Sequence, residues 1–218
     1  MGQRFKPMTL TIAPQASLTQ QLRQQLRRQR TGQPLAQQQA LSAQMVQHLR
    51  RSSAWRKARH IALYLPVRGE ADPRTLQQYT LPHQRFYLPV LAPCRRGELW
   101  FVRWDNHTRF RLNRFRIPEP IANAAQQRAA RALDLIITPL VGFDTTGTRM
   151  GMGGGFYDRT FAFKRIQRPY RQRPLLVGYA FAFQQVNNLK RQPWDVVLDA
   201  AVTESGLQYF RHKSGGRA

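Results

Sequence analysis

The sequence predicts an α/β fold, a single domain with a mainly parallel sheet flanked by helices in a Rossmann-like, three-layer arrangement. Short apolar runs rich in β-branched residues alternate along the chain with segments that favour helices, which is the pattern of a parallel sheet. The chain has 218 residues, 42% of them hydrophobic, enough for one domain with a substantial core. We expect that domain to span residues 17–210, between loose tails at 1–16 and 211–218 that are poor in apolar residues.

The first predicted elements are two helices. Three leucines at four-residue spacing, beginning at Leu18, predict an amphipathic helix over residues 17–30 with a basic, glutamine-rich face. Gly32 and Pro34 end this helix, and Pro34 can open a second one that runs to Arg51.

The rest of the chain alternates between the two element types. Asp72 followed by proline indicates a helix start, and the alanine-rich run before the central strand favours a helix. We therefore predict strands at 60–66, 85–90, 98–104, 133–138, 174–180 and 200–203, and helices at 73–79, 121–133 and 156–163.

A glycine-rich loop lies between the predicted strand 133–138 and the predicted helix 156–163. Its glycines leave the backbone N–H groups open to a bulky anion, and the first turn of the helix adds unpaired amides. Arg149 supplies a fixed positive fork, and Asp158 can hold a divalent cation that bridges phosphate oxygens. The pattern predicts a nucleotide-phosphate site with a metal.

Two common phosphate loops do not fit this segment. The dinucleotide fingerprint needs a third glycine where Phe156 stands, and a Walker A loop needs a lysine that this loop lacks. A flexible glycine turn is the simpler alternative for a glycine cluster alone. The arginine, the aspartate and two aromatic residues around the glycines favour a site.

The loop sequence RMGMGGGFYD at 149–158, preceded by TPLVGFD at 138–144 and by Gly147, resembles the signature of the 5-formyltetrahydrofolate cyclo-ligase family, also called methenyltetrahydrofolate synthetases. The resemblance extends collinearly over about residues 18–204. It is carried by LYLPVRGEAD at 63–72, FYLP at 86–89, IPEP at 117–120, VGY at 177–179 and WD at 194–195.

The resemblance implies an enzyme that uses ATP to convert 5-formyltetrahydrofolate to 5,10-methenyltetrahydrofolate, releasing ADP and phosphate after phosphorylation of the formyl oxygen. Two alternatives remain. One is a non-catalytic folate- or nucleotide-binding protein of the same fold that binds RNA through its basic surface. The other is a different α/β enzyme, such as a sugar-phosphate isomerase or a CoA transferase.

The resemblance also implies roles for individual residues. On pattern alone, Glu70 is typical of an exposed loop glutamate, Arg23 of a solvated helix face and Asp195 of a turn. Thr19 and Gly154 depart from the family, since basic residues are expected at both positions. The implied sets are Arg149 and Tyr157 for catalysis; Arg23, Arg149, Met150, Gly151, Met152, Gly153, Gly154, Gly155, Phe156 and Tyr157 for ATP; Leu65, Glu70, Phe115, Met152, Phe156 and Tyr157 for folate; and Asp158 and Asp195 for Mg²⁺.

The formal net charge of +24 attracts polyanions. A nucleic-acid binder is one explanation, but the arginines are spread from Arg4 to Arg217 and no zinc, RRM or KH signature accompanies them. We consider nucleic acid an unlikely partner. ATP and a polyglutamylated folate are both anions that part of the charge can steer, and the rest reflects an arginine-rich composition.

Cysteine usage and hydropathy bear on the compartment. Cys94 is the only cysteine, so no internal disulfide can form, which is compatible with a reducing compartment. No apolar run approaches the length of a membrane span, and residues 10–13 are too short and polar for a signal-peptide core. We expect a cytoplasmic monomer without a membrane partner.

Overall fold

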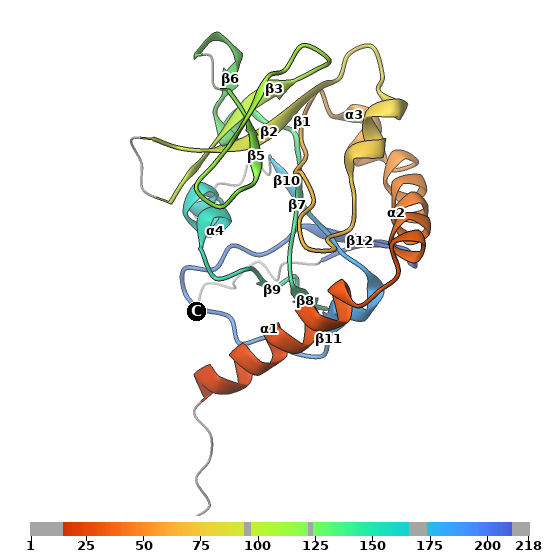
Figure 1. The fold of residues 1–218 in the computed structure, drawn as a ribbon, viewed down its shortest axis with the longest axis vertical. Helices are drawn as coiled ribbons and strands as arrows, with labels where there is room; N and C mark the ends of the chain where they lie inside the picture. Colours follow the sequence, from red (N-terminus) through yellow and green to blue (C-terminus); the bar gives the residue numbers. More distant parts are fainter. Residues whose placement is uncertain (1–14, 94–96, 122–123, 166–173, 211–218) are drawn as a thin grey trace, which may run out of the picture.

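The computed structural model describes residues 15–93, 97–121, 124–165 and 174–210, so residues 1–14 and 211–218 of the expected tails lie outside it. Its described part is organised around an eight-stranded sheet in the order β13-β12-β10-β7-β1-β2-β3-β6 (Figure 1). The strands are β1 (His60–Ala62), β2 (Arg85–Leu91), β3 (Leu99–Trp104), β6 (Gln127–Arg128), β7 (Leu135–Thr138), β10 (Leu175–Tyr179), β12 (Ala200–Thr203) and β13 (Gly206–Tyr209).

The middle of this sheet is parallel. β12, β10, β7, β1 and β2 pair in parallel, whereas β13, β3 and β6 join the edges in antiparallel fashion. All residues of β7 and β12 are buried, as expected for strands that are covered on both faces. The predicted mainly parallel α/β class is confirmed.

Helices cover both faces of the sheet. One layer contains α2 (Leu35–Arg50), α3 (Ser53–Lys57) and the 3₁₀ helix η1 (Arg74–Tyr79), and the other contains α4 (Phe156–Thr160) and η4 (Ala162–Arg165). Successive strand residues alternate between the two cores, because side chains in a strand point to opposite faces. Ile61 and Ile137 pack in the core beneath α2, and Ala62 and Ile136 in the core beneath α4. The three-layer arrangement is confirmed.

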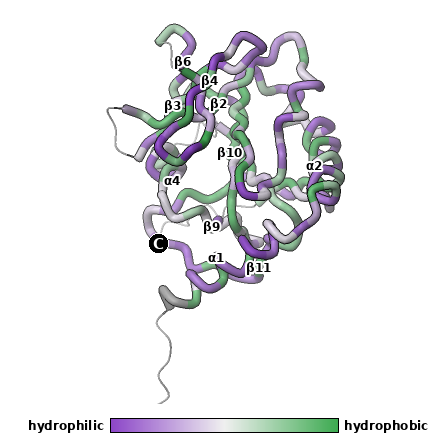
Figure 2. Tube along the Cα trace, viewed as in Figure 1, coloured by the Kyte–Doolittle hydropathy of each residue, from purple (hydrophilic) through white to green (hydrophobic). Residues whose placement is uncertain are grey.

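Helix α1 (Gln15–Thr31) lies apart from these layers, beside a small sheet of β11 (Gln185–Val186), β8 (Gly142–Asp144) and β9 (Arg149–Met150) (Figure 1). Its contact with this small sheet is a minor apolar cluster in which Leu26 packs against Val141, Met150 and Leu189. Strand β10 of the main sheet, by contrast, is hydrophobic along most of its length (Figure 2). Helix α1 therefore belongs to the region of the glycine loop rather than to a face of the main sheet.

The predicted helix at 121–133 is wrong over its described part. Residues 124–133 form the 3₁₀ turns η2 (Ala124–Gln126) and η3 (Ala130–Ala132), with strand β6 between them. β6 pairs with β3 at the sheet edge, so cross-strand hydrogen bonding overrides the helix preference of alanine. The other predicted elements exist with shifted ends: β1 stops at Ala62, and the helix predicted at 156–163 divides into α4 and η4.

Several observed elements were not predicted, among them α3, the small sheet of β8, β9 and β11, and the edge strand β13. β4 (Phe110–Leu112) and β5 (Pro118–Pro120) form a hairpin outside the main sheet, and η5 (Ala182–Gln184) precedes β11. Glu119 holds the hairpin in place, because its buried carboxylate accepts a hydrogen bond from the Leu91 N–H at 3.3 Å and contacts Arg111 at 3.4 Å. No helix in the described part of the chain is long and apolar enough to cross a membrane.

Candidate active site

The glycine loop connects β9 to α4. It is therefore preceded by the β8–β9 hairpin rather than directly by β7, as the sequence had suggested. A side chain added at Gly151 or Gly153 would meet no atom within 4 Å, so the backbone there faces open space. Gly155 has a φ of 64°, and a Cβ on it would lie 2.7 Å from the Arg159 guanidinium. The loop presents bare backbone to its surroundings, as the composition predicted.

Two cavities meet at this loop. The larger has a volume of about 1320 Å³, and the smaller one of about 670 Å³. Four residues line both of them: Arg149, Gly151, Gly155 and Asp158. A ligand in one cavity would consequently lie against the same short segment as a ligand in the other.

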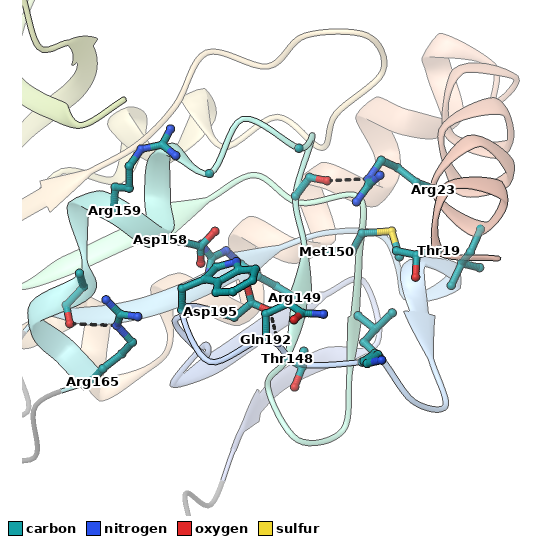
Figure 3. Close-up of a pocket in the computed structure, with 18 of the residues that line it drawn as sticks. Thr19, Arg23, Thr148, Arg149, Met150, Asp158, Arg159, Arg165, Gln192 and Asp195 are labelled. Atoms are coloured by element: carbon teal, nitrogen blue, oxygen red, sulfur yellow. Dashed lines mark hydrogen bonds and ion pairs between the residues drawn. The ribbon is translucent and has the colours of Figure 1, made fainter. Parts of the chain in front are cut away.

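The larger cavity is basic. Figure 3 shows Arg23 approaching from α1 on one side and Arg159 and Arg165 from the region of α4 on the other, with Arg149 between them. The Arg23 Nε donates a hydrogen bond to the Gly151 carbonyl at 3.2 Å, which ties α1 to the loop. Five cationic side chains line the cavity against three carboxylates, an excess that suits a polyphosphate. The cations are those of Arg23, Arg149, Arg159, Arg165 and Lys190, and the carboxylates those of Glu98, Asp158 and Asp195.

Hydrogen bonds to the Val196 backbone join the two ends of the loop, Arg149 and Asp158, to a distant segment. The Arg149 Nη2 lies 2.8 Å from the Asp158 Oδ1, and the Arg149 Nη1 donates to the Val196 carbonyl. The same Asp158 oxygen accepts the Val196 N–H at 3.1 Å. Asp195, the neighbour of Val196, is thereby held at the same cavity, where its Oδ2 accepts the Gln192 N–H at 2.8 Å.

Asp158 and Asp195 both line the larger cavity, from positions far apart in the chain (Figure 3). The described residues contain no group of three or more histidine, cysteine or acidic side chains that could hold a metal. Mg²⁺ is usually bound by one or two carboxylates together with phosphate oxygens, so two carboxylates beside a basic, phosphate-sized space fit this ion.

The smaller cavity contains a buried carboxylate. Glu70 is 8% exposed, in contrast to the exposed loop glutamate that its pattern alone indicates. Its Oε2 accepts the Val67 N–H at 3.1 Å, and its Oε1 lies 3.6 Å from the Arg30 Nη1. Burial raises the pKa of Glu70, and the charge of Arg30 opposes this shift. Burial and the nearby charge of Glu70 also raise the pKa of Tyr157, so its phenol stays protonated.

Apolar and aromatic side chains make up much of the remaining wall. Leu65 and Met152 line it, and Phe115 packs edge-on against Phe156 with ring centroids 5.8 Å apart. A planar ring bound here would have apolar contacts on its faces and a carboxylate for its N–H groups.

Arg30 is a part of the site that sequence reasoning missed. It is only 1% exposed, and it donates to the Arg68 and Leu140 carbonyls, each at 3.2 Å. Burial lowers its pKa, and Glu70 acts in the opposite direction. The only signal in the sequence is its position seven residues after Arg23, which places both side chains on one face of the helix.

Every residue that the sequence proposed for the site lines one of the two cavities, and their roles stay predictions. Some of the residues assigned to ATP line only the smaller cavity. The larger cavity has Arg23, Arg149, Met150, Gly151, Gly153, Gly155, Asp158 and Asp195; the smaller has Leu65, Glu70, Phe115, Met152, Gly154, Phe156 and Tyr157 in addition to the four shared residues.

Comparison with known proteins identifies the family of this chain. Residues 15–204 match the profile of the 5-formyltetrahydrofolate cyclo-ligase family. The chain belongs to this family. It is 38% identical to the 5-formyltetrahydrofolate cyclo-ligase of Haemophilus influenzae over 180 residues, which is 82% of this chain and 94% of that protein. It is 40% identical to the enzyme of the same name from Escherichia coli (strain K12), over 68% of this chain and 79% of that one.

A solved structure of a cyclo-ligase relative has the same fold. The NMR structure of Aquifex aeolicus 5,10-methenyltetrahydrofolate synthetase superposes with a TM-score of 0.74 at 27% identity, covering 92% of this chain and all of that one. The matched family region runs from α1 to the residue after β12, so it includes the residues of both cavities.

Proposed function

We propose that this protein is a cyclo-ligase that converts 5-formyltetrahydrofolate to 5,10-methenyltetrahydrofolate at the expense of ATP. The observation that carries the proposal is the shared wall of the two cavities. A basic space for a triphosphate and an apolar space with a buried carboxylate meet at Arg149 and the glycine loop. A reaction between a phosphate and a ring substituent needs both partners at one point.

The triphosphate of ATP would occupy the larger cavity. Arg23 and Arg149 would contact phosphate oxygens, and the open N–H groups of the loop between Met150 and Phe156 would cradle them. Asp158 and Asp195 would hold Mg²⁺, which when bound neutralises charge on the phosphate oxygens.

The folate would occupy the smaller cavity with its pterin ring toward Glu70. A pterin offers adjacent N–H donors, which a carboxylate accepts in pairs. Leu65, Phe115 and Phe156 would contact the rings. Tyr157 would donate a hydrogen bond, because its phenol is held in the protonated form.

The family resemblance implies a reaction that this arrangement would support. The formyl oxygen attacks the γ-phosphorus, and the bond from that phosphorus to the bridging oxygen of ADP breaks. The formyl carbon becomes electrophilic, N10 of the folate attacks it, and phosphate leaves with the electrons of the former C–O bond. Loss of the N10 proton gives the methenyl cation. The protein positions the two substrates and offsets charge on the transferred phosphoryl group through Arg149.

The decisive experiment follows the absorbance of methenyltetrahydrofolate with purified protein, Mg-ATP and 5-formyltetrahydrofolate. We expect the absorbance to grow only when all three components are present. Absence of turnover, together with salt-sensitive binding of RNA, would instead support a binding protein of the same fold.

We also propose that the protein acts in the cytoplasm as a monomer with one domain at residues 17–210. The lone cysteine is compatible with that compartment. Light scattering of the purified protein should give a mass near the 25.4 kDa of the chain.

A further inference from the structure

Cationic side chains that are scattered along the sequence gather at one end of the main sheet. This end carries the amino termini of the parallel strands β1, β2 and β7, whereas α1 and β9 lie at the other end (Figure 1). Five cationic residues at this end line neither cavity, and we call them the basic end. They are Arg56 and Lys57 at the end of α3, Arg59 before β1, Arg85 at the start of β2 and Arg128 in β6.

Direct contacts join the segments of the basic end. The Arg85 N–H donates to the Arg59 carbonyl at 2.7 Å, which fixes the start of β2 against the residue that precedes β1. The Arg128 Nη2 lies 2.7 Å from the Nε2 of His60, the next residue in the chain after Arg59. The spread of arginines along the sequence counted against a nucleic-acid partner, but the fold brings these arginines together on one surface.

Positive charge at the basic end exceeds negative charge. Burial lowers the pKa of His60, and the charges of three members of the basic end lower it further, against the opposing effect of Asp134. The Asp134 carboxylate accepts the N–H groups of Arg59 and His60, each at 2.9 Å. None of the five members forms an ion pair with a carboxylate of the described chain. Their charges are therefore available to an anionic partner.

The basic end also lacks exposed apolar side chains. Of the large hydrophobic residues that are exposed in the described part of the chain, none lies in the segments 53–60, 82–87 or 127–134. Protein interfaces depend on apolar and aromatic anchors, and peripheral membrane proteins insert such anchors into lipid. Proteins that bind single-stranded nucleic acid stack bases on exposed aromatic rings. Guanidinium groups without these anchors suit the phosphate backbone of a duplex, which requires charge and hydrogen-bond donors.

We propose that the basic end binds the phosphate backbone of double-helical RNA without reading its sequence. Duplex RNA is recognised mostly through its shape, phosphates and 2′-hydroxyl groups, because side chains cannot read its deep, narrow major groove. Folded RNA is abundant in the cytoplasm, where we place the protein. Because no member of the basic end lines either cavity, this binding goes beyond the cyclo-ligase reaction and does not depend on it.

Fluorescence anisotropy with a labelled RNA duplex tests the proposal over a series of salt concentrations. The duplex should have about 20 base pairs, enough for a protein that contacts successive grooves. We expect a Kd of about 1–100 µM at about 0.15 M salt, in the range of sequence-independent binding. Contact of about five side chains with phosphates should make log Kd rise with log salt concentration at a slope of about 3–5.

The test variant combines Arg56→Gln, Arg59→Gln and Arg85→Gln, which replace three exposed members of the basic end. The matched control makes the same change in net charge at three exposed arginines that line neither cavity, by Arg28→Gln, Arg114→Gln and Arg191→Gln. The test variant should raise Kd about 10-fold or more and lower the salt slope by about 2–3, and the control should change Kd less than about 2-fold. Cyclo-ligase turnover should be unchanged in both, which also shows that both variants fold.

Chemical-shift mapping gives a second measurement on the unmodified protein. Duplex RNA should shift the amide signals of residues 53–60, 82–87 and 127–134, and shifts confined to the two cavities would overturn the proposal. Equal loss of binding in the test variant and the control would show that overall charge attracts RNA without this surface. Tighter binding to duplex DNA, single-stranded RNA, polyglutamate or anionic vesicles than to duplex RNA would assign the surface to another partner. Absence of binding even at about 0.05 M salt would refute the proposal outright.

Discussion

Replacing Arg30 by methionine should destabilise the protein strongly. The side chain is 1% exposed, lies 3.6 Å from Glu70, and donates to two carbonyls, those of Arg68 and Leu140. Methionine fills a similar space and favours helix, so the variant removes the charge and the donors while leaving the packing largely in place.

The expected loss follows from what the variant leaves behind. Glu70 is 8% exposed and would keep its carboxylate without the opposing charge of Arg30, and two carbonyls would lose a donor. Removing one partner of a buried ion pair costs about 3–5 kcal/mol. For a chain of this size each kcal/mol lowers the melting temperature by about 2–4 °C, so the drop should be about 6–20 °C.

Thermal unfolding followed by circular dichroism measures this drop. Arg28→Met is the matched control, since Arg28 is exposed on the same helix and its loss should change stability by less than about 0.5 kcal/mol. Adding Glu70→Gln to Arg30→Met should restore part of the stability, because the pair is then neutral. A drop of less than about 3 °C for Arg30→Met would refute the reasoning.

Three further changes test other parts of the structure. Asp158→Asn should lower kcat about 100-fold or more and remove its dependence on Mg²⁺, while the fold is retained because the amide oxygen can still accept the Val196 N–H; a near-normal kcat would contradict the metal assignment. Glu70→Gln should raise the folate KM and leave the ATP KM in place. Because burial raises the pKa of Glu70 above its ordinary 4.5, the unmodified protein should lose folate affinity as pH falls through that raised pKa, where the carboxylate becomes protonated; the Gln variant should lack this dependence, and identical pH profiles would refute it. Gly178→Ala should cost about 1–3 kcal/mol in chemical unfolding, because its Cβ would lie 2.7 Å from the buried side chains of Leu140 and Leu198; unchanged stability would mean that this core can relax.

The fold could be predicted where one local signal decided the structure. The runs at 133–138 and 200–203 are apolar and β-branched in a way that suits strands covered on both faces, and both formed strands of the main sheet in which every residue is buried. The run at 121–133 failed because alanine reports only a local preference. The structure of its described part depends on pairing between β6 and the edge of β3, which lies more than twenty residues earlier in the chain.

The sequence predicted which residues form the site better than it predicted which of them are buried. Glycines, Arg149 and Asp158 at close spacing pointed to the loop, and the structure places all of them at the two cavities. Arg30 could not be separated from the exposed Arg28 two residues earlier, since both belong to the same basic helix. Which of them is buried depends on how α1 lies against the loop that carries Glu70, and no local pattern contains that information.

The position of α1 explains why this helix contains both exposed and buried arginines. Helix α2 buries Met45, Val46 and Leu49 against the sheet, but the described part of α1 buries only Leu26 and Arg30. Little apolar area therefore holds α1 in place, and polar contacts contribute much of its attachment. Those contacts go to the two loops of the site: Arg23 to the glycine loop, and Arg30 to the turn before Glu70. Since residues seven apart share a helix face, one helix fastens both cavities, and its arginines are needed where leucines would suffice for a helix on the sheet.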